Sequence, residues 1–305
     1  MRAHHVFLLS FCLIALGYIL KRVKVLREED GKTLSLVIFN VTMPAVILKT
    51  VSAVTLTPTL GFLTGFALIY ASALGLFSLV LLRKYHARTR GHLSMCASGF
   101  NVALFGYPLI EGIWGAAGLA HAAMFDLGNA FAVFVTAYLI GAVHADGGKR
   151  GISPGVIIRA LLSSAPFITY IVSIALNLSG IRLPAPVIDF ISVPAQANAA
   201  LVLLTLGLYL DFSFDRSRLK SVLYIIAVRY GFGLAAGLLL FFLLPFPLLA
   251  RTILLVCVLL PMAMAFLPMS VKLDYDARIT GMAANVSMLM SFILIWVLVT
   301  VLHLA

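Results

Sequence analysis

Two polar residues inside a long apolar stretch are the first candidates for chemistry in this chain. Asp126 and Asn129 are three positions apart, so a helix would place both side chains on one face. An ionisable group at membrane depth costs roughly 2.5 to 3.5 kcal/mol on insertion scales, which makes this carboxyl group a functional candidate. It could carry a coupling proton, or it could be a structural carboxyl group that braces a broken helix through hydrogen bonds.

Prolines and glycines predict that two other apolar stretches are interrupted helices. One contains Asn101, Gly106 and Pro108, and the other contains Pro261 and Pro268. Proline removes an amide donor and clashes with the preceding turn, whereas glycine permits strained backbone. Broken backbone survives in a bilayer only where it is buried in protein or lines a cavity, so paired breaks indicate a binding site. Two ordinary proline kinks are the alternative.

Further polar residues lie in the second half of the chain. Asn285 and Ser287 occupy the place in the last apolar stretch that corresponds to Asp126 and Asn129, although helix-to-helix hydrogen bonding is the preferred interpretation for Ser287. Arg229 is predicted to extend to the cytoplasmic interface, with pairing to an anion as the alternative. The candidate residues for binding a substrate or an ion are Asn101, Gly106, Pro108, Asp126, Asn129, Pro261 and Asn285.

The composition requires lipid as the main solvent of this chain. Hydrophobic residues make up 62% of its 305 positions and charged residues only 11%, and a water-soluble globule could not bury so much apolar surface. A net charge of +11 would suggest nucleic acid in a soluble protein. Here the basic residues lie in short segments between apolar stretches, where they set membrane topology. The lipid bilayer is therefore an expected partner, and nucleic acid is not.

The sequence predicts neither an enzyme nor a bound metal. Cys12, Cys96 and Cys257 each lie inside an apolar stretch without metal-ligand spacing, and we expect no disulfide, metal site or cofactor. The sequence contains no HExxH or GxSxG motif and no paired intramembrane aspartates. A single buried aspartate cannot supply both an acid and a base.

Apolar stretches recur along the chain at about the length of a membrane span. A bilayer core about 30 Å thick needs about 20 apolar residues per helix. The first stretch ends in Lys21 and Arg22 without a small-residue cleavage site, so we interpret it as a span and not as a signal peptide. The ten predicted spans are 6–20, 33–52, 58–82, 93–112, 117–142, 155–178, 187–210, 221–244, 250–271 and 279–303.

Basic residues in the loops support this number of spans. One set of alternate loops holds sixteen of them, namely Lys21, Arg22, Lys24, Arg27, Lys32, Arg83, Lys84, Arg88, Arg90, Lys149, Arg150, Arg216, Arg218, Lys220, Lys272 and Arg278. The other set holds four, namely Arg2, Lys49, Arg182 and Arg251. Basic residues remain preferentially in the cytoplasm, so both termini are predicted on the non-cytoplasmic side.

Ten spans divide into two halves of five, and an odd number per half reverses the orientation of the second half. This is the arrangement of inverted repeats in many secondary carriers. The longer loop after the fifth span, from His144 to Arg150, is the expected joint. We therefore predict an all-α polytopic membrane protein, one integral unit with repeats at 1–145 and 146–305.

Short motifs spread over the chain point to a known family. They are GYILKR at 17–22, LVIF at 36–39, MPA at 43–45, Asn101 with GYP at 106–108, FDLGN at 125–129, GLYL at 207–210 and Pro261. Together they resemble the auxin efflux carrier family, which includes bacterial malonate-type transporters and shares its fold with bile acid sodium symporters. The resemblance implies ten helices, with the broken helices 4 and 9 crossing each other, and the export or uptake of small organic anions. Many relatives have polar residues near the second break, whereas this chain has MAMAF at 262–266, which predicts a less polar pocket.

These observations predict a secondary active transporter that works by alternating access. The expected substrate is a small organic anion, a carboxylate such as malonate or an auxin-like acid, and the coupling ion is H+ or Na+. A channel, or a transporter-like sensor without a transport cycle, is the alternative. We expect the chain in the plasma (inner) membrane, and Gly233 and Gly237 are spaced as in motifs that allow a homodimer.

Overall fold

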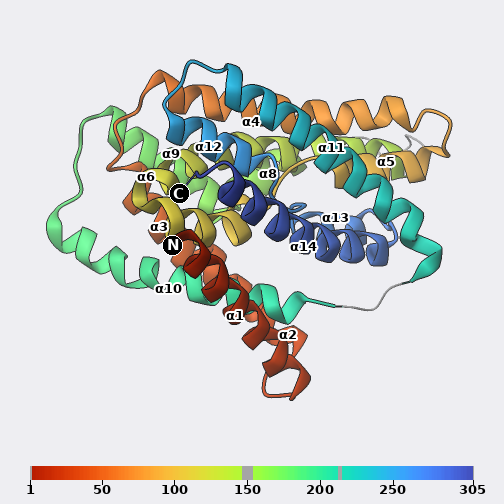
Figure 1. Cartoon of the computed structure of the whole chain (residues 1–305), viewed down its shortest axis with the longest axis horizontal. Helices are drawn as coiled ribbons and strands as arrows, with labels where there is room; N and C mark the ends of the chain where they lie inside the picture. The colour runs from red at the N-terminus through yellow and green to blue at the C-terminus, as the bar shows by residue number, and fades with distance from the viewer. Residues whose placement is uncertain (1, 146–153, 212–214, 305) are drawn as a thin grey trace.

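The computed structural model describes residues 2–145, 154–211 and 215–304, which form helices joined by short loops (Figure 1). Extended pairing in these ranges is limited to one isolated bridge. The helices up to residue 145 are α1 (Arg2–Arg22), α2 (Glu28–Val37), η1 (Ile38–Thr42), α3 (Met43–Val51), α4 (Pro58–Leu81), α5 (Ala87–Ala97), η2 (Val102–Gly106), α6 (Tyr107–Phe131), η3 (Ala132–Ala137) and α7 (Tyr138–Ala145). Those after it are α8 (Pro154–Leu162), α9 (Ala165–Leu178), α10 (Ala185–Tyr209), η4 (Arg216–Arg218), α11 (Leu219–Leu243), α12 (Leu248–Cys257), α13 (Phe266–Lys272) and α14 (Ala277–Val301).

The described helices have the length and the surface of a multi-pass membrane protein. Seven helical segments are long and apolar enough to cross a bilayer, and α9 and α12 are shorter apolar helices. Large apolar side chains point outward, and those of Ile69, Phe190 and Leu243 are 69, 77 and 68% exposed. Such exposure would be unfavourable in water and is the expected state against lipid.

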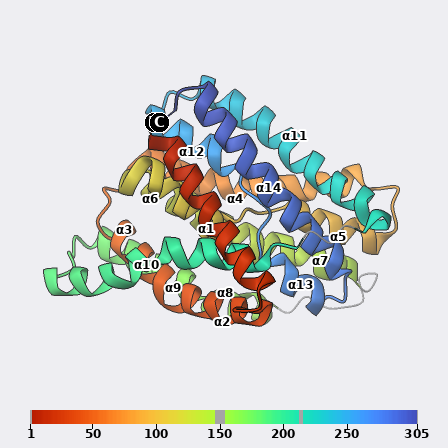
Figure 2. The ribbon, with the colours of Figure 1, turned by 60° about the horizontal axis from the view of Figure 1, so that its bottom comes forward.

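The helices form two packed groups, and each group combines segments from both ends of the sequence. In bundle A, α1 and α3 pack against α10, and α9 packs against α3. Bundle B contains α4 to α7, with η2 and η3, and α11 to α14. Figure 1 and Figure 2 both show α1 crossing α10 to one side of bundle B. Because α6 contacts α1, α3, α9 and α10, it is the helix of bundle B that faces bundle A.

Several predicted span boundaries differ from the helices. The second span begins at Glu28 and not at residue 33, because Asp30 accepts a hydrogen bond from the amide of Arg27 at 2.7 Å and closes a polar first turn. The predicted span 155–178 is divided between α8 and α9, and Ser164 caps the second piece by accepting from the amide of Phe167. Of the predicted joint from His144 to Arg150, His144 belongs to α7, and residues 146–150 lie outside the described residues.

The fourth and fifth predicted spans are not separated by a loop. The segment α6 runs from Tyr107 to Phe131, and its backbone leaves the helical conformation only at Gly115, where φ is +63°. Glycine adopts this left-handed conformation at little cost because it has no Cβ. A single residue therefore separates the part of α6 that continues η2 from the part that carries Asp126.

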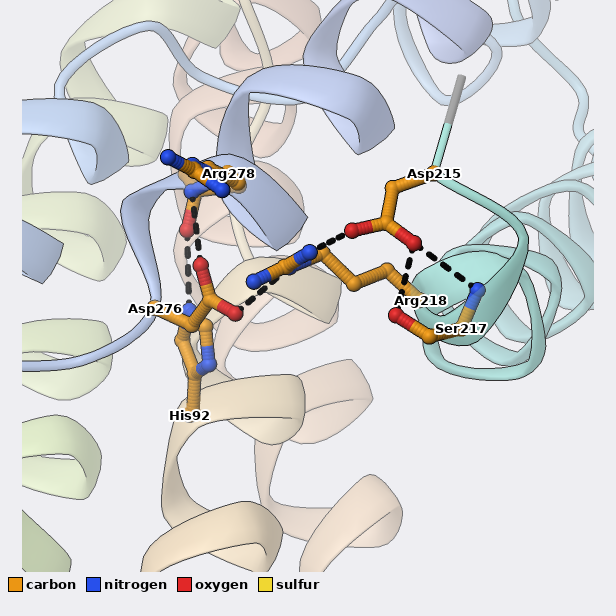
Figure 3. Close-up of polar contacts among 7 residues, drawn as sticks. His92, Asp215, Ser217, Arg218, Asp276 and Arg278 are labelled. Atoms are coloured by element: carbon orange, nitrogen blue, oxygen red, sulfur yellow. Dashed lines mark hydrogen bonds and ion pairs between the residues drawn. The ribbon is translucent and has the colours of Figure 1, made fainter.

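Polar side chains join the segments that precede α11 and α14 (Figure 3). Asp276 caps α14 by accepting from the amide of Arg278 at 3.0 Å, and it also accepts from Nε of Arg218 at 2.7 Å. Arg218 forms a second ion pair with Asp215, which accepts from the amide of Ser217 at 2.9 Å. Partial burial by itself would raise the pKa of Asp276, but the hydrogen bonds from Arg218 and Arg278 outweigh it and lower that pKa below its usual value.

Close backbone contact holds bundle A together. A Cβ on Gly17 would lie 2.2 Å from the carbonyl oxygen of Leu204, and a Cβ on Gly207 would lie 2.1 Å from that of Ile14. Gly233 and Gly237, the spacing that suggested a dimer, pack against α12 of the same chain. A second copy of the chain would therefore need another surface.

We expect Gly207→Ala to lower the apparent melting temperature of the purified protein. The new methyl group would meet backbone that cannot move aside, and overpacking costs typically about 1–3 kcal/mol. Gly231→Ala is the matched control, because a Cβ at Gly231 in α11 has nothing within 4 Å and alanine is the better helix former. Equal melting temperatures for the two variants would contradict the close packing of α1 against α10.

Candidate functional site

The two predicted helix interruptions are present, and they contact each other directly. The helix α5 ends at Ala97 and η2 begins at Val102, while α12 ends at Cys257 and α13 begins at Phe266. Between them, the amide of Asn101 donates to the carbonyl oxygen of Pro261 at 2.9 Å, next to an antiparallel bridge between residues 100 and 262. The breaks therefore satisfy part of each other's exposed backbone, which has no water to bond within a bilayer.

Asn101 and Gly99 shape the first break. The side chain of Asn101 is 6% exposed, and its Oδ1 accepts from the amide of Leu104 at 3.2 Å, so it caps the start of η2. Gly99 has φ +64°, which places the actual turn at this residue. The amide end of η2 carries partial positive charge, as does any helix N-terminus.

Asn129 holds the first break from the neighbouring helix α6. Its Oδ1 accepts from the amide of Phe100, and its Nδ2 donates to the carbonyl oxygen of Phe100, both at 2.8 Å. The side chain thus pairs with both main-chain groups of one residue, as a neighbouring strand would. Asn129 is 3% exposed and also donates to Oδ1 of Asp126 at 3.2 Å, which links the break to the carboxylate.

Ser287 holds the second break in a similar way from α14. Its Oγ accepts from the amide of Met262 at 3.1 Å and donates to the carbonyl oxygen of Ala284 at 2.9 Å. Ser291, one turn further along, donates to the carbonyl oxygen of Leu259 at 2.6 Å. Each break is therefore bound by side chains of the long helix that follows it in the sequence.

Asp126 lies at the contact between the two bundles. Its Oδ2 accepts from the hydroxyl of Tyr170 at 3.0 Å and from that of Tyr107 at 3.3 Å, and the two hydroxyls also contact each other. Asp126 and Tyr107 belong to α6 in bundle B, whereas Tyr170 belongs to α9 in bundle A. The carboxylate is enclosed, with 9% of its residue surface exposed. Its hydrogen bond to Tyr170 must break if the bundles slide past each other.

Arg229 lies at the crossing and not at the membrane surface, so its predicted placement at the cytoplasmic interface was wrong. The residue is 1% exposed, and its guanidinium group donates to carbonyl oxygens of both breaks. No carboxylate within the described residues pairs with it. The carbonyl groups provide the partners that an anion or interfacial water would otherwise supply.

The aromatic ring of Phe100 is packed between two donors. The Cζ of Arg229 lies 4.8 Å from the ring centroid, and the ring of Tyr70 stacks on it at 6.1 Å. The hydroxyl of Tyr70 and Nε of Arg229 are buried, and neither has a hydrogen-bond partner in the described part of the chain. Unpaired buried donors are uncommon in folded proteins.

A cavity of about 480 Å³ opens between the two bundles. Its walls are Val46, Lys49, Thr50, Ala53, Val54, Glu111, Ala116, Ala117, Leu119, Ala120, Ile188, Ala195 and Gln196, which come mainly from α3, α6 and α10. Most of these side chains are apolar, and Lys49 and Glu111 supply one charge of each sign. Ala120, one of its walls, lies less than two helical turns before Asp126 on α6, but neither Asp126 nor a residue of the breaks lines the cavity.

The structure brings together only some of the residues singled out from the sequence. Asn101, Pro261, Asn129 and Asp126 form one connected group. Gly106 is adjacent to it, since a Cβ there would lie 2.9 Å from Cδ1 of Leu260.

Pro108 and Asn285 differ from the sequence-based picture. Pro108 does not interrupt a helix, because η2 ends at Gly106 and α6 begins at Tyr107 with helical backbone at Gly106. Asn285 is only partly buried and makes no hydrogen bond to a described residue, whereas its neighbour Ser287 binds the break.

Three residues of the site were not among the candidates. Tyr170 is an isolated tyrosine in a distant span, and no local pattern connects it with Asp126. Ser287 was considered and assigned to helix packing. Arg229 had a usable signal, because a charged residue in the middle of an apolar span is a functional candidate by default.

Comparison with known proteins gives one family. The family model described as "Membrane transport protein" matches residues 5–302. A protein of Methanothermobacter thermautotrophicus described as an uncharacterized transporter is 28% identical over 232 residues, 71% of this chain and 71% of its own length. A second uncharacterized transporter, from Methanocaldococcus jannaschii, is 28% identical over 215 residues, 68% of each chain.

We expect Asn129→Ala to destabilise the fold and Asn285→Ala to leave it unchanged. Removal of Asn129 leaves the amide and the carbonyl group of Phe100 buried without partners, at roughly 1 to 3 kcal/mol for each group. Asn285 is the matched control, an asparagine on the corresponding helix of the second half. Thermal unfolding of the two purified variants tests this. A smaller fall in melting temperature for Asn129→Ala than for Asn285→Ala would show that Asn129 does not hold the first break.

Proposed function

Because the chain belongs to the membrane transport protein family, the auxin efflux carriers that its motifs resemble, we propose that it is a secondary carrier of a small organic anion. Family membership makes it a transporter, and the paired breaks supply the reason for a carrier. The substrate class is a carboxylate such as malonate or an auxin-like acid, with H+ or Na+ as the coupling ion.

Positive charge near the crossing supports an anionic substrate. Arg229 binds the carbonyl ends of the breaks, which leaves the amide end of η2, beside Asn101, as the partly positive group. Lys49 and Glu111 line the cavity between the bundles and supply one charge of each sign there. The apolar walls of that cavity suit the hydrocarbon part of an organic acid, and the few polar groups suit its carboxylate.

The division of the helices into two packed bundles supports alternating access. The breaks, Asp126 and Arg229 all belong to bundle B, and the cavity lies where bundle B meets bundle A. A solute held at the breaks would travel with bundle B. The hydrogen bond from Tyr170 to Asp126 crosses this boundary, so it acts as a latch that favours one arrangement of the bundles.

The protonation state of Asp126 offers a route to proton coupling. As a carboxylate, Asp126 accepts hydrogen bonds from Tyr170, Tyr107 and Asn129. A proton on the carboxyl group would remove the charge and weaken the hydrogen bonds that both tyrosines donate. Proton binding would thereby release the latch.

We also propose a topology for this carrier. It has ten spans in two inverted repeats, at 1–145 and 146–305, and both termini lie outside the cytoplasm. The matching roles of Asn129 and Ser287 at the two breaks support the repeats. The plasma (inner) membrane is the proposed location.

Cysteines introduced at Arg182 and at Lys84, in a chain without its own cysteines, test the orientation in intact cells. An impermeant maleimide should label the first and spare the second, and the reverse result would exclude this topology.

Counterflow in proteoliposomes tests the carrier. Vesicles preloaded with the transported acid should take up labelled acid faster than empty vesicles, whereas a channel or a sensor gives no such stimulation.

Asn101→Ala should abolish counterflow while stability falls only by the loss of a helix cap, about 0.5–2 kcal/mol. Counterflow of Asn101→Ala at the wild-type rate would remove this residue from the site.

The pH dependence of transport tests the role of Asp126. We expect uptake by the wild type to vary with pH and uptake by Asp126→Asn to be independent of pH, because the amide cannot exchange a proton in this range. Tyr170→Phe is the control, since it removes a latch bond and keeps the titrating group. A wild-type pH profile in Asp126→Asn would leave the residue with a structural role only.

A further inference from the structure

The guanidinium group of Arg229 is bound by main-chain carbonyl groups from both breaks. Its Nη1 lies 2.9 Å from the oxygen of Ala97, 3.2 Å from that of Ser98 and 2.7 Å from that of Gly99. Its Nη2 lies 3.0 Å from the oxygen of Leu260. Four carbonyl oxygens from two interrupted helices therefore converge on one cation.

This convergence is the chemistry of a monovalent cation site. The ends of α5 and α12 carry the partial negative charge of helix C-termini, and unwound carbonyl groups next to such ends coordinate Na+ in carriers with broken helices. Here carbonyl oxygens of the same kind bind the guanidinium group of Arg229, a side chain of α11. The face of the Phe100 ring, 4.8 Å from Cζ, adds a further favourable contact for a cation.

We propose that Arg229 is the resident cation of the crossing, and that it takes the place of an exchangeable sodium ion there. The inference deepens the proposed carrier function, because it excludes Na+ as a coupling ion bound at these carbonyl groups. Its transport test rests on that proposed function. Arg229 is a positioning residue in this role. It neutralises the carbonyl ends and holds the two breaks together through every transport cycle.

Arginine suits this role better than lysine. Its charge persists under all conditions that a folded protein meets, and its planar fork presents five donors in fixed directions. Two of its nitrogen atoms reach oxygens from two different breaks. A lysine ammonium group would be a point charge and could not span both sets with the same geometry.

Thermal unfolding of the purified protein tests the assignment without any substrate. At constant ionic strength, the wild type should melt at the same temperature in sodium chloride and in choline chloride. Arg229→Ala should melt on the order of 10 °C lower, because buried carbonyl groups lose their partner. Low millimolar guanidinium chloride should restore part of that loss in a saturable way, and choline should not.

Arg251→Ala is the matched control for guanidinium rescue. Arg251 donates to a single carbonyl oxygen, that of Phe241 at 3.0 Å, and its Cζ lies 5.6 Å from the same residue's ring. Its removal should lower the melting temperature less, and guanidinium should give no saturable rescue. Equal rescue of both variants would show a general salt effect and overturn the assignment.

Sodium titration of the wild type can overturn the proposal by itself, so the test does not depend on whether Arg229→Ala folds. Saturable stabilisation of the wild type by Na+ relative to choline would show an exchangeable site and contradict a resident cation. Arg229→Lys gives a second variant, expected to melt between the wild type and Arg229→Ala.

Transport distinguishes this inference from the proposed function. Counterflow by the wild type should proceed at the same rate when choline replaces sodium on both sides of the membrane. A rate that falls at least tenfold without sodium would overturn the inference while leaving the carrier intact. Absence of counterflow in both media would instead refute the carrier, and the unfolding data alone would then decide the role of Arg229.

Discussion

The need to satisfy exposed backbone at membrane depth is the constraint on which the rest of this structure depends. Two helices stop and restart inside the apolar part of the protein, and each leaves amide and carbonyl groups that lipid cannot bind. The hydrogen bond from Asn101 to Pro261 joins the two gaps. Side chains of α6, α11 and α14 bind the groups that remain. Each of these polar residues would be unfavourable in its span by itself, and each is stabilised because a break lies beside it.

The carbonyl ends and the amide ends of the broken helices bind different partners. The carbonyl ends of α5 and α12 are bound by Arg229, which belongs to the same bundle and can move with them. The amide end of η2 is capped by Asn101 and lies near Asn129 and Asp126. An arrangement with a fixed cation on one side of the crossing leaves the other side for an anion. This division is the basis of the proposed carrier of organic acids.

Asp126 connects the site to the motion that transport requires. Its partner Tyr170 comes from α9, on the far side of the boundary between the bundles, while Asn129 connects it to the first break. Three successive hydrogen bonds, from Phe100 to Asn129, from Asn129 to Asp126 and from Asp126 to Tyr170, therefore connect the break with the boundary. The cavity along α3, α6 and α10 lies at the same boundary. The carboxylate of Asp126 and the cavity both lie where α6 meets bundle A.

The sequence by itself determined the solvent, the helical class, the family and the places where two spans are interrupted. These follow from local quantities, namely apolar length, the distribution of basic residues, and the backbone chemistry of glycine and proline. It also identified Asn101, Asp126, Asn129 and Pro261, because polar and helix-breaking residues are conspicuous in apolar stretches. The tertiary structure alone decided that Tyr170 bonds to Asp126, that Ser287 and not Asn285 binds the second break, and that Arg229 turns inward. Those contacts join residues that are 25 to 132 positions apart, and no local pattern encodes which helices will become neighbours.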